Sequence, residues 1–114
     1  MTTCRPWGSF TVLVEGPGYK VKQLDVLPGQ RLSQQLHRHR REVWVGALGV
    51  LVAEVDGVET TVSPGDVVVV PRGSVHRLSN RTTEPGRLME VQQGPRVDED
   101  DIVRLADDHG RCPQ

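Results

Sequence analysis

Short runs of apolar residues, rich in Val and Leu, alternate with turn signals along most of the chain. The clusters Glu15-Gly16-Pro17-Gly18 and Ser63-Pro64-Gly65-Asp66 separate such runs, and Asp56-Gly57 between two valines is typical of a tight hairpin. β-Branched residues between these signals favour strands. The predicted strands lie within residues 10–14, 19–27, 43–54, 67–70 and 87–92, and the four consecutive valines 67–70 predict a buried strand.

No helical periodicity of useful length occurs before residue 98. Between Asp98 and Ala106, acidic residues stand where a helix N-terminus favours them, which predicts a short C-terminal helical turn. Many short strands at turn-limited spacing indicate a β-sandwich or barrel. We therefore expect an all-β fold in which residues 9–93 form two packed antiparallel sheets.

The length of 114 residues corresponds to one domain, with a core at about 5–106 and a loose tail at 107–114. This tail carries His109, for which we expect no function. Cys4 and Cys112 lie near opposite ends, so they form neither a close-spaced zinc motif nor an expected disulfide.

Charge and hydropathy exclude several classes of protein. Fourteen Lys and Arg residues against 15 Asp and Glu give a net charge of -1, whereas a general nucleic-acid binder normally has a basic excess. No apolar run approaches the roughly 20 residues that a membrane helix needs. Residues 1–6 lack the apolar core of a signal peptide. We expect a cytoplasmic protein that binds neither nucleic acid nor membrane.

A polar stripe begins after Pro28-Gly29. Ser33, Gln35 and His37 alternate, as does Arg31 before them, so on a strand they point to one side, toward solvent or toward a polar cavity. His76 follows a Pro-x-Gly turn after the valine run, at the edge of the expected interior. The alternative is that these are surface residues on a one-sided sheet.

Two histidines, a carboxylate and an amide oxygen are a suitable ligand set for Zn, Mn, Fe or Ni. Gln35, His37, Glu42 and His76 supply these groups and leave positions open for water or substrate. These four side chains are therefore candidate ligands for a divalent metal ion, and the spacings around them decide the prediction of a metal ion at this set.

The spacings around these residues form two segments. The first is Gly29, five residues, Gln35, one residue, His37, four residues, Glu42, six residues, Gly49. The second is Gly65, five residues, Pro71, one residue, Gly73, two residues, His76, three residues, Asn80. They resemble the two motifs of the cupin superfamily, with one departure, because Gln35 stands where His is usual. The resemblance implies a single cupin jelly roll.

A longer ordered set of segments narrows the resemblance. It comprises RPWGSF (5–10), KVK (20–22), QLHRHRREVW (35–44), HRLSN (76–80), EVQ (90–92) and EDDIVR (99–104). Together they resemble the type II mannose-6-phosphate isomerase domain, the cupin part of bifunctional proteins that also carry mannose-1-phosphate guanylyltransferase. In a stretch of 114 residues we expect only the cupin part.

The family resemblance implies a cytoplasmic, metal-dependent interconversion of mannose 6-phosphate and fructose 6-phosphate. The sequence is similar to the family's metal site at Gln35, His37, Glu42 and His76, so the resemblance implies a metal ion bound by these residues. Arg38 and Val43 stand where the family often has His, a departure that bears on the identity of the substrate.

Three groups remain candidates for the general base: His39, Glu90 and a metal-bound water. His39 shares the alternation face of His37, so it is also an alternative ligand or a substrate contact. Glu90 alternates with Met89 and Val91 on the last strand, and the sequence leaves open which face of that strand is buried.

Three residues are candidates for substrate binding. Lys22 shares one face of its strand with Leu24 and Val26, which are expected in the core, so its ammonium is expected at the cavity mouth, where it would bind phosphate. The alternative is a lysine that extends to solvent. Arg40 lies in an expected bulge and either grips phosphate or is solvated. Ser33 lies one step from Gln35 and would add a hydroxyl.

The leading functional hypothesis is an aldose–ketose isomerase with a sugar phosphate as its small-molecule partner. A metal-dependent cupin dioxygenase, which an apolar cavity would favour, and a non-catalytic sugar-binding cupin are the alternatives. Exposed sheet edges also predict a homodimer, with Trp44 and residues 67–70 in the core or at the dimer face.

Overall fold

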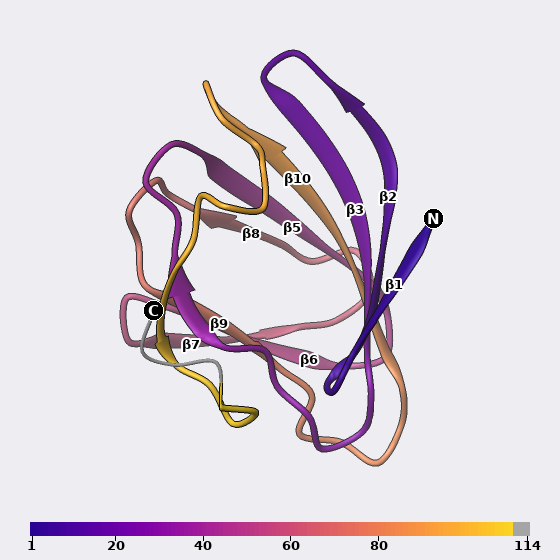
Figure 1. Ribbon diagram of the computed structural model, residues 1–114. Coiled ribbons are helices and arrows are strands. Elements are labelled where there is room, and N and C mark those ends of the chain that lie inside the picture. Colours follow the sequence, from indigo (N-terminus) through magenta and orange to yellow (C-terminus); the bar gives the residue numbers. More distant parts are fainter. Residues whose placement is uncertain (111–114) are drawn as a thin grey trace.

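Two antiparallel sheets contain all the strands of residues 1–110, the part of the chain that the computed structural model describes (Figure 1). The six-stranded sheet has the order β1-β2-β3-β10-β5-β8, and the five-stranded sheet has the order β11-β4-β9-β6-β7. The strands of the first are β1 (Thr2–Arg5), β2 (Gly8–Gly16), β3 (Tyr19–Val26), β10 (Gly86–Gln93), β5 (Arg41–Leu48) and β8 (Val67–Val70). Those of the second are β11 (Val103–Ala106), β4 (Gln34–Leu36), β9 (His76–Ser79), β6 (Leu51–Val55) and β7 (Val58–Val62).

This arrangement confirms the predicted all-β fold. No helix occurs in residues 1–110, and hence none that is long and apolar enough to cross a membrane. The predicted hairpin at Asp56-Gly57 joins β6 to β7, and both residues have positive φ, 49° and 84°, as a tight two-residue turn requires.

The inner face of the six-stranded sheet is divided into an apolar end and a polar end. In the register of β3 with β10, Leu24 lies opposite Leu88, whereas Lys22 lies opposite Glu90. All four side chains are buried, because alternate residues of each strand point into the space between the sheets. The apolar core therefore fills one end, and buried polar groups line the other. The core residues are Trp7, Leu24, Val26, Trp44, Leu51, Ala53, Val62, Val70, Leu78 and Leu88.

The predicted C-terminal helical turn is wrong. Residues 103–106 form β11, which pairs with β4, because an edge strand offers backbone partners that a solvated turn lacks. The acidic residues before it do not cap a helix. The Asp101 carboxylate accepts hydrogen bonds from the backbone N–H groups of Arg38 and His39 instead.

The valine run 67–70 was expected to be a buried strand, and the structure buries only one face of it. β8 is the edge strand of its sheet, where Val70 is 1% exposed but Val67 and Val69 are 60% and 49% exposed. Trp44 was expected either in the core or at a dimer face, and it lies in the core.

Part of the expected tail at 107–114 falls outside the described residues, including Cys112. Within the described part, both carboxylate oxygens of Asp108 accept hydrogen bonds from the Arg31 guanidinium, at 2.7 and 2.9 Å. Cys4 is exposed and is not in a disulfide.

Candidate metal centre and adjoining cavity

Three buried side chains from separate parts of the chain converge at the polar end of the barrel. His37 lies between β4 and β5, Glu42 on β5 and His76 at the start of β9. One ligand atom from each lies within 4.8 Å of the other two, and Nε2 of His37 is 3.2 Å from Oε2 of Glu42. Gln35 lies directly opposite His76 in the pairing of β4 with β9, so both side chains leave the sheet on the same face. The structure thus brings the four predicted metal ligands to one side of the barrel interior.

Hydrogen bonds fix both imidazole rings in the form that binds a metal through Nε2. Nδ1 of His76 lies 3.0 Å from the Ser74 carbonyl oxygen, and Nδ1 of His37 lies 2.5 Å from the Asp101 carbonyl oxygen. A carbonyl oxygen only accepts, so each Nδ1 carries the proton and each Nε2 is a free base. Nε2 of His76 is buried and has no hydrogen-bond partner among the described residues.

Burial keeps both rings neutral. Burial and, next in size, the charge of the nearby Arg40 guanidinium together lower the pKa of His37 to about 4. Burial also lowers the pKa of His76. A metal ion binds the neutral imidazole, so these environments favour ligation at neutral pH.

The Glu42 carboxylate is held from two sides. Nε1 of Trp44 donates to Oε1 at 2.9 Å, and Nε of Arg40 donates to Oε2 at 3.0 Å. A second Arg40 nitrogen donates to Nε2 of His37 at 3.2 Å. The guanidinium therefore bonds the atoms that a metal would use, and a metal ion would replace these hydrogen bonds. With an orphaned Nε2, a buried carboxylate and the facing Gln35 amide, the donor set fits a divalent ion such as Zn, Mn, Fe or Ni.

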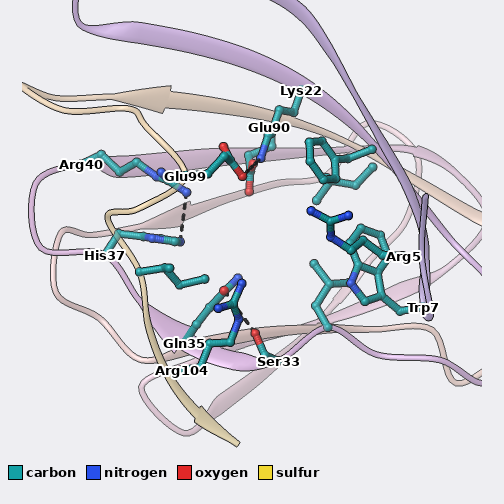
Figure 2. Close-up of a pocket in the computed structure, with 14 residues that line it drawn as sticks. Arg5, Trp7, Lys22, Ser33, Gln35, His37, Arg40, Glu90, Glu99 and Arg104 are labelled. Carbon is teal, nitrogen blue, oxygen red and sulfur yellow. Dashed lines mark hydrogen bonds and ion pairs between the residues drawn. The ribbon is translucent and has the colours of Figure 1, made fainter. Parts of the chain in front are cut away.

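A cavity of about 120 Å³ adjoins this centre. Four cationic side chains from separate parts of the chain surround it, as Figure 2 shows: Arg5, Lys22, Arg40 and Arg104. Two carboxyl groups, Glu90 and Glu99, also line it. The other lining residues are Ser33, Gln35 and His37 on the polar side and Trp7, Phe10, Leu24, Leu32 and Ile102 on the apolar side. Cations outnumber carboxyl groups, so the cavity favours an anionic ligand.

Glu90 projects inward, which settles the face that the sequence left open. Burial and, next in size, the neighbouring Glu42 carboxylate together raise the pKa of Glu90 to about 8. Oε2 of Glu90 accepts a hydrogen bond from Nε2 of Gln92 at 2.9 Å. The structure therefore provides a carboxyl group in the cavity wall that can hold a proton near neutral pH.

The other predicted site residues divide into two groups. Lys22, Ser33 and Arg40 line the cavity, with the Ser33 hydroxyl donating to the Gln35 amide oxygen at 3.2 Å. His39 does not line it: its ring is 43% exposed, and Nδ1 lies 3.0 Å from Oδ1 of Asp101. Arg31 likewise departs from the expected polar face and is exposed.

Sequence reasoning assigned no role to three cavity residues, Arg5, Arg104 and Glu99. Arg5 ends β1 and its guanidinium lies 5.4 Å from the centre of the Phe10 ring, while Arg104 lies on β11. Their signal was present, because all three fall in the ordered segments 5–10 and 99–104. What the sequence lacked was any indication that the two ends of the chain meet at one cavity.

Comparison with protein families decides the relationship. The family model described as "Mannose-6-phosphate isomerase C-terminal" matches residues 1–107. The chain belongs to this family. Its relatives include the mannose-1-phosphate guanylyltransferase of Escherichia coli strain K12, which is 39% identical over 107 residues, and the alginate biosynthesis protein AlgA of Pseudomonas aeruginosa, which is 40% identical over 110 residues.

These matches cover 94% and 96% of this chain but only 22% and 23% of the two relatives, so this member of the mannose-6-phosphate isomerase C-terminal family spans about a fifth of their length. Among solved structures, the capsular polysaccharide assembling protein CapF of Staphylococcus aureus superposes with a TM-score of 0.83 at 20% identity, covering 93% of this chain and 34% of CapF. The Cnp3 cupin domain of Schizosaccharomyces pombe gives a TM-score of 0.72 at 18% identity, covering 75% and 64% of the two chains. These likenesses show that the fold is a cupin.

Proposed function

We propose that this chain is a metal-dependent aldose–ketose isomerase domain that acts on a sugar phosphate of the mannose 6-phosphate type. The observation that carries the proposal is that a candidate metal centre lies next to a cationic cavity. A cluster of His37, Glu42 and His76 adjoins a cavity with an excess of cationic side chains. The first suits the hydroxyl and carbonyl oxygens of a sugar, and the second suits a phosphate. Membership of the mannose-6-phosphate isomerase C-terminal family supports the same substrate class.

Gln35, His37, Glu42 and His76 would hold the divalent ion, which supplies Lewis-acid polarisation of the substrate oxygens when bound. The protein's own part is proton transfer. Isomerisation moves one proton between adjacent carbons and one between their oxygens, so it needs no oxidant or reductant. Glu90 is the candidate that lines the cavity, and its carboxylate would take the proton from one carbon and return it to the next. His39 lies outside the cavity lining and is the weaker candidate.

The cavity lining favours the isomerase over the dioxygenase. An apolar lining would have suited an oxygenase, but charged and polar side chains supply nine of the fourteen lining residues. A non-catalytic sugar-binding cupin is distinguished by experiment, because such a protein would bind the sugar phosphate without turnover.

The test is the formation of fructose 6-phosphate from mannose 6-phosphate by the purified chain loaded with Zn, Mn, Fe or Ni in turn. We expect activity with at least one of these metals, none with unphosphorylated mannose, and none in His76→Gln. The exposed His109 provides the matched control His109→Gln, which should retain activity. Metal-loaded protein that binds mannose 6-phosphate without converting it would overturn the isomerase and leave a sugar-binding cupin.

A further inference from the structure

Two lysines stand side by side on the inner face of β3. Lys20 and Lys22 are two residues apart, so their side chains leave the strand in the same direction, and each side chain is only 6% exposed. Two ammonium groups that lose most of their hydration next to each other need a negative charge between them. The structure supplies that charge from another part of the chain.

The charge comes from Glu99. Its two carboxylate oxygens accept hydrogen bonds from Nζ of Lys22 at 2.7 Å and from Nζ of Lys20 at 3.2 Å. Glu99 belongs to residues 96–102, which we call the strap and which connect β10 of one sheet to β11 of the other. Unlike the lysines, the Glu99 side chain is 53% exposed, and Figure 2 shows it beside Lys22 at the cavity.

We propose that Lys20 and Lys22 form a binding subsite for a phosphate group, and that Glu99 occupies this subsite only until a phosphate displaces it. The proposal deepens, and rests on, the proposed function, because it assigns a place for the phosphate of the sugar where Lys22 and Glu99 line the cavity, with Lys20 beside Lys22 on β3 but outside the lining residues. Both lysines are fixed on a strand, whereas Glu99 lies on a segment without regular structure. A phosphate carries up to two negative charges and three acceptor oxygens, so it satisfies two ammonium groups better than one carboxylate does.

The size of the cavity supports displacement. Sites for small molecules usually enclose about 300–1,000 Å³, and this one measures about 120 Å³. A sugar phosphate therefore needs additional space. Glu99 is a lining residue with a half-exposed side chain, so its movement into solvent would enlarge the cavity without disturbing a strand.

The strap also contacts the metal centre. The carbonyl oxygen of Asp98 accepts a hydrogen bond from Arg40 at 3.1 Å, and that of Asp101 accepts one from Nδ1 of His37. Displacement of Glu99 by phosphate would thus alter a segment that orients a metal ligand. Thermodynamic linkage then requires that metal binding and phosphate binding change each other's affinity by the same factor.

The experiment measures the affinity of inorganic phosphate for the whole metal-free chain by titration calorimetry. Glu99→Gln removes the competing charge with little change of shape. If Glu99 occupies the subsite in about nine molecules of ten, only about one in ten is open to phosphate. We therefore expect Glu99→Gln to bind phosphate roughly tenfold more tightly. Glu59→Gln is the matched control. Like Glu99, Glu59 is half-exposed and forms an ion pair, in its case with Arg81, and neither of these two residues lines the cavity. This control should bind as the unaltered chain does.

Equal or weaker binding in Glu99→Gln would overturn the proposal. That variant breaks the Glu99 ion pairs of both buried lysines, although the Glu15 carboxylate remains 3.8 Å from Lys20. Because its folding is at risk, a second measurement uses the unaltered chain. In a phosphate titration followed by amide NMR, we expect the largest shifts at residues 98–101. Shifts confined to Arg5 and Arg104, with none in the strap, would also overturn the proposal.

The two proposals fail independently. Phosphate binding that displaces Glu99, in a chain with no turnover of mannose 6-phosphate, would retain the subsite and reject the isomerase. Turnover of mannose 6-phosphate with no effect of Glu99→Gln on phosphate affinity would retain the isomerase and reject the subsite.

Discussion

His76 is the residue whose surroundings most clearly suit a metal ligand. Its ring is 1% exposed, Nδ1 faces a carbonyl oxygen, and Nε2 has no partner among the described residues. A buried polar atom without a partner costs about 1–3 kcal/mol, a cost that metal coordination would remove.

We predict that His76→Gln lowers the affinity for the divalent ion by more than about 100-fold. Loss of a residue that only hydrogen-bonds to a metal ligand already costs about 10–100-fold, and His76 would be a ligand itself. Metal content after dialysis, measured by elemental analysis, checks this. His109→Gln should keep the metal content of the unaltered chain. Full metal content in His76→Gln would show that the ion binds elsewhere.

Glu90 is the residue that we propose as the general base. Glu90→Gln removes the proposed base but keeps the shape of the cavity wall. We predict that kcat for mannose 6-phosphate falls about 10²–10⁴-fold, the usual contribution of a general base, with little change in KM. The split between kcat and KM separates loss of proton transfer from loss of binding. If His39→Gln lowers kcat by that amount and Glu90→Gln does not, the roles are reversed.

Among the structural elements, the strap connects several parts of the site. Glu99 pairs with both buried lysines, while the Asp101 carboxylate holds the backbone N–H groups of Arg38 and His39. Burial acts to raise the pKa of Glu99, but the charges and hydrogen bonds of Lys22 and Lys20 outweigh it, so the pKa is lowered below 4.5.

This lowered pKa predicts a pH dependence of stability. A carboxyl group with a depressed pKa in the folded state stabilises the fold above its unfolded pKa, and that contribution is lost as the pH falls through the folded value. Besides the lysines, the Glu15 carboxylate is close, 3.8 Å from Lys20. We expect Glu99→Gln to melt below the unaltered chain at pH 7, by no more than about 4–8 °C for a half-exposed pair. The difference in Tm should shrink below pH 4.5. A Tm difference that is constant with pH would contradict the ion-pair account.

Some elements were predictable from the alternation of residues or from turn signals, and one segment was not. The pattern around Lys22, Leu24 and Val26 predicted both a strand and its inner face, because side chains of a strand alternate with a period of two. The hairpin at Asp56-Gly57 followed from turn chemistry. The strap was not predictable, because Glu99 forms ion pairs with Lys20 and Lys22, which lie 79 and 77 positions away, and Asp101 contacts residues more than 60 positions away. Without those partners, the same residues resemble a helix N-terminus, which produced the wrong helix prediction.

For the molecule as a whole, a row of valines crosses the outer face of the six-stranded sheet. The strand registers place Val14, Val21, Val91, Val43 and Val69 in one row across five strands. Val14 and Val69 are 47% and 49% exposed. The row reaches the edge strand β8, where backbone groups are also available for pairing.

We expect a second copy of the chain to cover this face, since a two-fold axis would place the same valines against each other. Light scattering after gel filtration should give twice the chain mass of 12.6 kDa. Val69→Lys should shift the mass to that of a monomer. Val58→Lys, at a 66% exposed valine of the other sheet, is the control and should remain dimeric. A monomeric unaltered chain would contradict the dimer.

The cavity is also a property of the whole molecule. Arg5 and Arg104 are almost 100 residues apart in the sequence and meet only because β1 and β11 belong to sheets that close around one space. The four candidate metal ligands, whose binding of an ion stays a prediction, were predictable as a cluster because their spacings resemble the two cupin motifs. The cations were not, since an arginine near either end of a chain is usually solvated.

The most direct test of the central claim, metal-assisted isomerisation at this cavity, is proton NMR of mannose 6-phosphate incubated in D₂O with the metal-loaded chain. We expect signals of fructose 6-phosphate and solvent deuterium on the carbons between which the proton moves, both abolished in His76→Gln. Neither product nor deuterium incorporation, from a chain shown to hold both metal and sugar phosphate, would contradict it.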